Sequence, residues 1–330
     1  MPFAPAPAGP SHQIAEHMTV YIPKVSVVIP TCNRPHTLRR AINSVLRQTF
    51  IDLELIVVDD ASDLDTARQL VAEISAADPR VTYIRREHRG GAAAARNTGI
   101  SAARGEFIAF QDDDDEWLLN KLASQLALFE RLGSDCLLVG GGLLRYVPNA
   151  NPKVYKWPAV EGELWVDARR YIEGHTAFIQ TVLARRVAVK SLGGFNPEVP
   201  ISEDYEFGLR ILERGRMATV PDFVTVSYEQ PASLSNQRPL RVVSNQKILG
   251  LHWQTLSRYP KAVGVLHYEI AVNNAVLGQR ADAFRHWWRA FRFDPYPFRI
   301  WLLLPMLFLG AVATERGIQI SQGIKKRLGH

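Results

Sequence analysis

The sequence predicts an α/β fold with a mainly parallel sheet flanked by helices. The evidence is a series of β-branched and apolar runs, each of which ends in polar or turn-forming residues, with helical spacing of apolar residues between the first two. Two such strands joined by one helix form a parallel pair with a right-handed crossover, and their functional loops lie at the carboxyl ends of the strands. The runs are Val25–Ile29, Leu53–Val58 and Phe107–Phe110.

The elements between these runs follow in the order of a strand–helix–strand fold. After the first strand, apolar residues recur at helical spacing, and a second helix is expected over 65–77, before a short strand at 81–84. Gly90 and Gly91 then open an Ala-rich helix, which leads into the third long strand. We therefore expect the loops after all these strands to meet at one edge of the sheet, where open α/β sheets bind ligands.

The composition is that of a globular protein in a reducing compartment. The chain has 330 residues, of which 47% are hydrophobic and 22% are charged. Two cysteines, Cys32 and Cys136, form neither a disulfide framework nor a metal-ligand spacing, which favours the cytoplasm. Residues 1–23 lack the basic start and apolar core of a secretory signal, and we interpret them as a flexible tail.

The positive charge is concentrated at one end of the chain. Residues 280–330 hold nine Lys and Arg and three Asp and Glu, which accounts for the whole formal net charge of +6. A nucleic-acid-binding protein usually carries a basic face on its main domain. Because the first 279 residues are formally neutral, no nucleic-acid partner is expected.

Four consecutive carboxylates, Asp112–Asp115, follow the buried run Phe107–Phe110. Carboxylates that a strand end delivers into a cleft are typical ligands of a hard divalent ion such as Mg²⁺ or Mn²⁺. The alternative for an isolated run of this kind is a solvated acidic turn. The glycines near residue 90 match neither the dinucleotide-binding nor the P-loop spacing, which disfavours a dehydrogenase or a kinase.

Five blocks of the sequence together resemble glycosyltransferase family 2, whose members are inverting enzymes with the GT-A fold. The blocks occur in the family's order within residues 24–235. They are Val25–Arg34, Leu55–Ser62, Ala95–Gly99, Gly105–Trp117 and Gly193–Arg210.

The resemblance implies a nucleotide-sugar donor, most often a UDP-sugar, and a divalent cation. Asp112 and Asp114 fit the family's D-x-D motif, which makes Asp114 the expected main metal ligand with Asp112 beside it. A metal ion neutralises the departing diphosphate. Asp115 and Glu116 are expected to support the loop or to cap a helix that begins near Trp117. The implied donor-binding residues are Pro30, Thr31, Asn33, Asp60, Arg96, Asp112 and Asp113.

A second acidic element, Glu203-Asp204, resembles the family's E-D pair. An inverting transfer needs a carboxylate that takes the proton from the acceptor hydroxyl as it attacks. The resemblance implies that Asp204 is this base and that Glu203 lies beside it, near the acceptor. The alternative is a helix N-terminus with Ser202 as its cap, and the two interpretations are compatible.

The C-terminal part is expected to be an appended helical region. Its apolar stretch Ile300–Ala313 has fourteen residues, whereas a membrane-spanning helix needs about 20. Flanked by Trp287, Trp288, Trp301 and the arginines, it favours an element held at an anionic membrane surface. The alternative is a helix docked on the catalytic domain.

The expected organisation is a tail over 1–23, a catalytic domain over 24–238 and a helical region over 239–330. The expected function is metal-dependent transfer of a sugar to a saccharide or lipid-linked acceptor in cell-surface or extracellular polysaccharide synthesis. The enzyme would act in the cytoplasm or at the inner face of the plasma membrane. Two alternatives are a nucleotidyltransferase or sugar-phosphate pyrophosphorylase, and a non-catalytic sugar-binding protein of the same fold.

Overall fold

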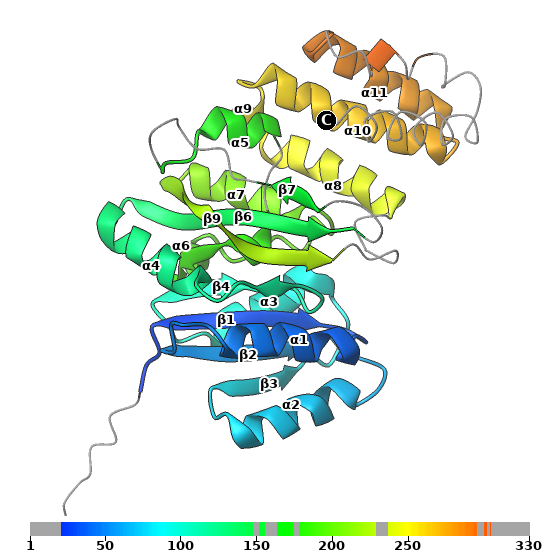
Figure 1. The fold of residues 1–330 in the computed structure, drawn as a ribbon. Helices are drawn as coiled ribbons and strands as arrows, with labels where there is room; N and C mark the ends of the chain where they lie inside the picture. The colour runs from blue at the N-terminus through cyan, green and yellow to red at the C-terminus, as the bar shows by residue number, and fades with distance from the viewer. Residues whose placement is uncertain are drawn as a thin grey trace, which may run out of the picture.

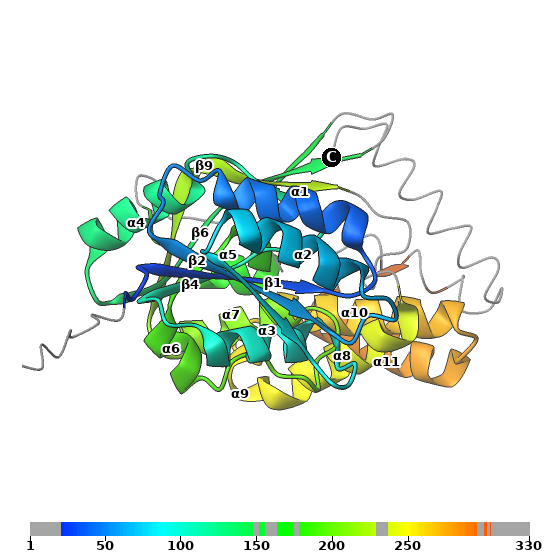
Figure 2. The ribbon, with the colours of Figure 1, turned by 90° about the horizontal axis from the view of Figure 1, so that it is seen from below.

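The computed structural model describes residues 21–147, 152–155, 164–174, 178–228, 237–295, 300, 301 and 304. Within these residues, one mixed sheet of nine strands lies between two layers of helices (Figures 1 and 2). This arrangement confirms the α/β fold class with flanking helices and a C-terminal helical region.

The first half of the sheet is parallel and has the predicted order. Four neighbouring parallel strands have their carboxyl ends at the same edge: β3 (Val81–Arg85), β2 (Leu53–Asp59), β1 (Val25–Thr31) and β4 (Phe107–Phe110). β1, β2 and β3 extend one or two residues beyond the runs seen in the sequence, whereas β4 has the bounds of its run. Thr31 therefore pairs with Asp59 at the end of β1 and β2.

The second half of the sheet mixes both directions. β8 (Leu183–Arg185) is antiparallel to β4 and to β6 (Cys136–Tyr146), while β9 (Arg216–Tyr228) is parallel to β6. β7 (Lys153–Tyr155) pairs with β6, and the short strand β5 (Glu116–Trp117) pairs antiparallel with β9. The sheet is therefore parallel on one side of β4 and mixed on the other.

The prediction of a helix that begins near Trp117 is wrong. Glu116 and Trp117 form β5, and helix α4 (Lys121–Leu132) begins four residues later. Trp117 is buried, its backbone N–H donates to Ser44 Oγ at 3.1 Å, and its ring N–H donates to the Gln180 carbonyl at 2.9 Å. Burial of a large aromatic ring is strongly favourable. The chain after the acidic loop therefore pairs with the sheet at Trp117 before helix α4 begins.

Two layers of helices cover the sheet. α1 (Pro35–Leu46), α2 (Thr66–Ala77) and α4 lie on one face, whereas α3 (Gly91–Ala102), α6 (Arg186–Ser191) and α7 (Glu203–Leu212) lie on the other (Figure 2). Successive residues of β1 point to opposite faces, so Val27 belongs to the first core and Val28 to the second. Such burial on both faces explains why the parallel strands are continuous apolar runs.

The C-terminal helices extend the second core. They are α8 (Arg238–Leu251), α9 (Trp253–Leu256), α10 (Pro260–Val276) and α11 (Arg280–Phe293), and they follow α5 (Ala168–Gly174) along the chain. Ile248 and Leu266 belong to the same hydrophobic cluster as Val28 and Phe110 of the sheet. The division at residue 238 stays a prediction, and α8 and α10 share apolar packing with the part that precedes it.

The outer end of this region has a small core of its own, which includes Ala271, Trp287 and Ile300. Trp287 is buried and its ring N–H donates to the Ile300 carbonyl at 2.8 Å, while Trp288 and Trp301 are about half exposed. Within the described residues, no helix combines the length and the apolar character needed to cross a membrane. Most of Ile300–Ala313, like residues 1–20, lies outside the described part of the chain.

Candidate active site

A cavity of about 930 Å³ lies at the carboxyl edge of the sheet, on the side where the predicted site residues were expected. Nine of the ten predicted residues line it: Pro30, Thr31, Asp60, Arg96, Asp112, Asp113, Asp114, Glu203 and Asp204. Asn33 does not line the cavity. Its side chain instead bonds to Asp63 through Nδ2 at 2.6 Å and accepts the Asp63 backbone N–H at 2.8 Å, which ties together the loops after β1 and β2.

Asp60, one of the predicted donor-binding residues, binds the N-terminus of α3. Its carboxylate accepts the backbone N–H groups of Gly90, at 3.0 Å, and Gly91, at 2.6 Å, and also bonds to the Arg86 guanidinium. Free N–H groups and the helix dipole favour a negative charge at this position. Asp60 thus fixes the loop that forms one wall of the cavity.

Asp113 and Asp114 lie where β4 ends and share one arginine. Thr31 Oγ1 donates to Asp113 Oδ2 at 2.7 Å, and Arg34 Nη1 lies 3.2 Å from Asp113 Oδ1 and 2.8 Å from Asp114 Oδ2. Burial, together with repulsion from the neighbouring carboxylates, raises the pKa of Asp113 to about 7 despite these contacts. The pKa of Asp114 is also raised, by burial and by Asp112.

Asp115 supports the loop from behind. It accepts the Gln180 side-chain amide at 2.9 Å and the backbone N–H of Tyr228 at 3.2 Å. Burial and the charges of Asp112 and Asp114 raise its pKa well above the ordinary value. These bonds connect the acidic loop to β9 and to the short 3₁₀ helix Ile179–Thr181.

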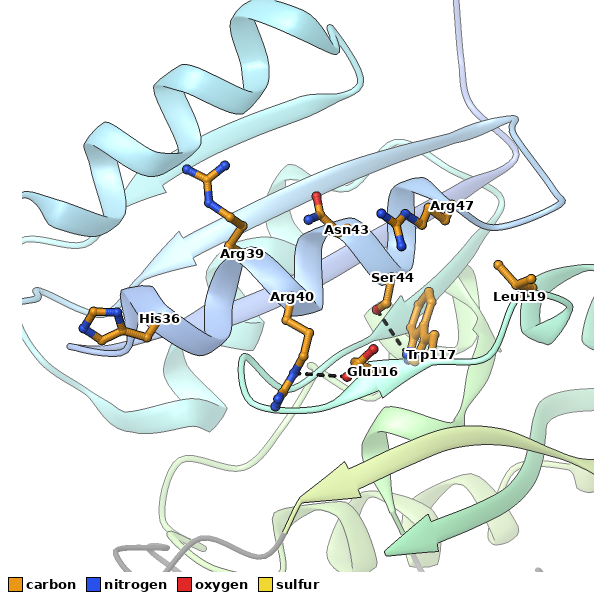
Figure 3. A pocket seen from close by; sticks show the side chains of 9 residues that line it. All are labelled: His36, Arg39, Arg40, Asn43, Ser44, Arg47, Glu116, Trp117 and Leu119. Atoms are coloured by element: carbon orange, nitrogen blue, oxygen red, sulfur yellow. Dashed lines mark hydrogen bonds and ion pairs between the residues drawn. The ribbon is translucent and has the colours of Figure 1, made fainter. Parts of the chain in front are cut away.

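Arg40 of α1 binds the outer side of the acidic loop. Its Nη2 donates to the Asp114 carbonyl at 2.6 Å, its Nε lies 3.2 Å from Glu116 Oε1, and its guanidinium lies 4.0 Å from the centre of the Tyr228 ring. Figure 3 shows Arg40 reaching Glu116, and Ser44 one turn further along α1 receiving the Trp117 backbone N–H. The position of the acidic run therefore depends on α1 as well as on β4.

Arg96 connects the two acidic elements. It is almost fully buried, Nη2 lies 2.7 Å from Asp112 Oδ1, and Nη1 bonds to Glu203 Oε1. A guanidinium that meets two carboxylates is the arrangement in which a buried charge is compensated. The predicted donor-binding residue Arg96 is thus placed between the predicted metal ligand Asp112 and the predicted acceptor-side Glu203.

Asp204 lies beside Glu203 in the first turn of α7. Among the described residues its hydrogen-bond partner is the backbone N–H of Tyr205, at 2.7 Å. Burial raises its pKa to about 7, and the Glu203 charge adds to this effect, whereas Arg96 opposes it. Ser202 does occupy the cap position of α7, but its side chain makes no capping bond and its φ is 62°.

The backbone is strained around the cavity. Within the described residues, the non-glycine residues with positive φ are Asn33, Ala61 and Ser202. Ser202 lines the cavity, and the other two adjoin the lining residues Cys32 and Asp60. Residues held in the left-handed region cost about 1–3 kcal/mol each and cluster at functional sites, which supports a functional role for this edge.

The donor chemistry of this edge fits a divalent cation. Asp112, Asp113 and Asp114 supply carboxylate oxygens to one cavity, and a cation would relieve the repulsion that raises the pKa of Asp113 and Asp114. In the part of the chain that the structure describes, no three His, Cys, Asp or Glu side chains are grouped so as to hold an ion. Arg34 supplies the positive charge at Asp114 in this structure.

The structure adds residues to this cavity that no sequence motif indicated. Arg34 is the last residue of the block Val25–Arg34 that resembles the family, but the sequence did not predict that it pairs with Asp113 and Asp114. Arg145 of β6, Arg241 of α8 and Glu269 of α10 also line the cavity. They come from segments without any catalytic motif, so that sequence reasoning had no signal for them.

Comparison with known proteins agrees with this geometry. Residues 26–188 match the model of the family described as Glycosyl transferase family 2. The chain is 45% identical over 104 residues to UDP-Glc:alpha-D-GlcNAc-diphosphoundecaprenol beta-1,3-glucosyltransferase WfgD of Escherichia coli, which covers 32% of this chain and 40% of WfgD. It is 41% identical over 138 residues to the putative colanic acid biosynthesis glycosyl transferase WcaA of E. coli K12, with 42% and 47% covered. The chain thus spans less than half the length of these two relatives.

Two solved structures share the fold. S. aureus TarS 1–349 in complex with UDP-GlcNAc has a TM-score of 0.56 at 20% identity, with 83% of this chain and 89% of TarS covered. The mannosyltransferase PcManGT from Pyrobaculum calidifontis, in complex with GDP-Man and Mn²⁺, has a TM-score of 0.52 at 20% identity, with 93% and 88% covered. At this identity the likeness concerns the fold.

Proposed function

Because the chain belongs to glycosyltransferase family 2 and has the GT-A fold, we propose that it transfers the sugar of a nucleoside-diphosphate sugar to an acceptor hydroxyl. One observation carries the proposal: the acidic run after β4 and the acidic start of α7 face the same cavity and are joined by Arg96. A donor bound to the first element would therefore present its sugar to a base on the second.

Asp204 is the base in this proposal, and the transfer inverts the anomeric carbon. Its carboxylate takes the proton of the acceptor hydroxyl while the hydroxyl oxygen bonds to the anomeric carbon and the diphosphate leaves from the opposite face. A base is most effective when its pKa is close to the working pH, and the pKa of Asp204 is raised to about 7. Glu203 pairs with Arg96, and in this proposal it orients the neighbourhood of the acceptor.

The donor is a nucleotide sugar, most simply a UDP-sugar. UDP-Glc stands in the name of the relative WfgD, and the TarS structure holds UDP-GlcNAc. In this chain, Pro30, Thr31 and Asp60 line the half of the cavity formed by β1, β2 and α3. We assign the nucleoside to this half, with Arg96, Asp112 and Asp113 toward the sugar and the diphosphate.

A divalent cation, Mg²⁺ or Mn²⁺, completes the proposed site. Asp114 would be the main ligand with Asp112 beside it, and the bound ion would neutralise charge on the leaving diphosphate. The Mn²⁺ in the PcManGT structure supports this assignment, as do the raised pKa values of Asp113 and Asp114.

The proposed acceptor is a saccharide carried on a lipid, in the synthesis of a cell-surface or extracellular polysaccharide. The names of two relatives specify diphosphoundecaprenol or PP-undecaprenol acceptors, and WcaA is named for colanic acid biosynthesis. A lipid-linked acceptor places the enzyme at the inner face of the plasma membrane. The surface of α11 suits this location, because Phe284, Arg285, Trp288 and Arg289 are exposed on it.

The activity is tested by incubating the purified chain with a panel of nucleotide sugars, Mn²⁺ and a lipid-linked sugar acceptor, with the released nucleotide as the readout. We expect nucleoside diphosphate with one donor. A pyrophosphorylase would instead convert the nucleotide sugar to nucleoside triphosphate and sugar 1-phosphate, and only when pyrophosphate is added. Release of no nucleotide from any donor would contradict the transferase assignment.

Membrane binding is tested by flotation of the full chain with anionic liposomes. We expect binding at low salt that weakens at high salt, and a marked loss in F284S/W288S, because each exposed basic residue is worth about 1 kcal/mol near such a surface and the aromatic rings add apolar burial. The control is V187S, which changes an exposed apolar residue of α6. A wild-type chain that stays in the soluble fraction at low salt contradicts the membrane assignment.

A further inference from the structure

Five arginines line the cavity, and four of them are paired with carboxylates. Arg34 pairs with Asp113 and Asp114, Arg89 with Asp63 at 2.9 Å, Arg96 with Asp112 and Glu203, and Arg241 with Glu269 at 3.9 Å. Within the described part of the chain, Arg145 pairs with no carboxylate. Its charge is therefore available to a ligand without the loss of an internal ion pair.

Two aromatic rings hold Arg145 in place. Its guanidinium lies 5.3 Å from the centre of the Tyr155 ring and 5.6 Å from that of Phe178, and these two rings contact each other edge-on at 5.1 Å. Stacking on rings restricts a long side chain while leaving its N–H groups free to donate. Arg145 is thus held in a position from which it can bind an anion. Phe178 also lines the cavity.

The position of Arg145 separates it from the proposed donor half. That half is formed by β1, β2 and α3, on one side of β4, whereas β6 lies on the other side, beyond β8. Arg145 pairs across the sheet with Ser227 of β9, and Ser227 and Tyr228 line the cavity beside it. Arg241 and Glu269 of the C-terminal helices also belong to the lining. Arg145 therefore lies on the part of the cavity wall that is outside the proposed donor half, where an acceptor would bind.

We propose that Arg145 binds a phosphate of the acceptor, the group that joins the acceptor sugar to its carrier. This inference rests on the proposed glycosyl transfer and names the acceptor class of the same cavity. The planar guanidinium fork matches two phosphate oxygens and can donate two parallel hydrogen bonds to them. The donor also carries phosphate, so the test has to tell the two sources apart.

The test measures a second phosphate site while the donor half is filled. The full chain is saturated with UDP and Mg²⁺, and N-acetylglucosamine 1-phosphate is titrated and followed by ³¹P NMR. Methyl N-acetylglucosaminide is the uncharged probe, and its binding is followed by ¹H NMR because it contains no phosphorus. We expect the phosphate probe to bind to the wild type, about 10- to 100-fold more weakly to R145Q, and with intermediate strength to R145K, since hydrogen bonds to charged groups are worth this much in affinity. UDP affinity should be equal in all three.

R216Q is the matched control, because Arg216 also lies over an aromatic ring, Trp165 at 3.6 Å, yet does not line the cavity. Thermal unfolding of each variant shows that it is folded. The inference is overturned if R145Q binds the phosphate probe as well as the wild type, if the wild type binds no phosphate probe beside UDP, or if R145Q loses UDP affinity, which would assign Arg145 to the donor. Failure of UDP and of every other nucleoside diphosphate to bind overturns the proposed function itself.

Discussion

The acidic run after β4 and the acidic start of α7 consist of the same residue types but differ in their partners. At α7, Glu206 is buried, and hydrogen bonds from His252 and Arg210 outweigh the effect of burial and lower its pKa. Asp204, two residues earlier, lacks a cationic partner in hydrogen-bond contact among the described residues, and its pKa rises to about 7. One short helix thus holds one acid with a lowered pKa and another with a raised pKa.

In the strand-end run, three of the four carboxylates have a raised pKa. Burial and mutual repulsion raise the pKa of Asp113, Asp114 and Asp115, although Arg34 lies on two of them. The run therefore carries more negative charge than its protein partners compensate. Protein partners, and not residue type, thus distinguish the two runs. This difference supports the proposal that the first run binds a cation and that the second holds the base.

The largest expected effect is that of D204N, which removes the base from the second run. We expect kcat to fall by about 10²- to 10⁴-fold while donor affinity stays nearly unchanged, because a general base contributes this much and Asp204 is the proposed base on the acceptor side. Kinetics with both substrates and a donor-binding assay provide the measurement. The control E198Q changes an exposed acid near α7. Collapse of donor affinity with an unchanged turnover of bound donor would assign Asp204 to the donor instead.

R96M breaks the connection between the two runs. Removing one partner of a buried ion pair costs about 3–5 kcal/mol of unfolding free energy, because it leaves buried charges uncompensated. Arg96 is 4% exposed in its side chain and meets carboxylates of both runs. Denaturant unfolding of R96M and R34M compares this arginine with a half-exposed one, whose loss should cost much less. Equal losses of unfolding free energy in R96M and R34M would mean that the ion pairs of Arg96 with the two runs stabilise the fold no more than those of Arg34.

D114N tests the cation at the first run. It should lower kcat by roughly 10²- to 10³-fold, as does the loss of one group that stabilises developing charge, with an unchanged thermal midpoint because the side-chain volume is kept. Titration with Mn²⁺ should show weaker metal binding than in the wild type. Full activity of D114N, or undiminished wild-type activity in excess chelator, would exclude a catalytic metal at Asp114.

The smallest expected effect is the dependence of kcat/KM on pH, which compares the titration of Asp204 with that of Glu206. Asp204 has to be deprotonated to act, and its pKa is raised to about 7, so kcat/KM should rise about tenfold per pH unit below 7 and level off above it. Since the pKa of Glu206 is lowered, this acid stays charged throughout the range and adds no step. D204N should lose the part of this step that Asp204 contributes, whereas the titration of Asp113, whose pKa is also raised to about 7, stays in both proteins. A wild-type profile that is flat from pH 5 to 8 contradicts the assignment of the base.

Nine of the ten residues predicted from the sequence line the cavity, and the reason is local. A buried parallel strand is a continuous apolar run, and the polar residues after it have to lie at the carboxyl edge, so Thr31, Asp60 and Asp112 are brought together once the strand order is known. Asn33 was predicted as a donor-binding residue and follows the same strand, but it does not line the cavity, because its side chain bonds to Asp63. The helix expected near Trp117 was wrong because burial of one aromatic ring outweighed the local acidic pattern.

By itself, the sequence determined the fold class, the parallel half of the sheet and the edge at which the carboxylates meet, because each follows from short-range patterns of apolar and polar residues. Only the tertiary structure decided how those carboxylates are charged. Arg96 and Glu203 are 107 residues apart in the chain, and Arg145, Arg241 and Glu269 reach the cavity from β6 and the C-terminal helices. The pKa of a carboxylate depends on burial and on charges within a few ångströms, and these neighbours exist only after distant segments have packed together.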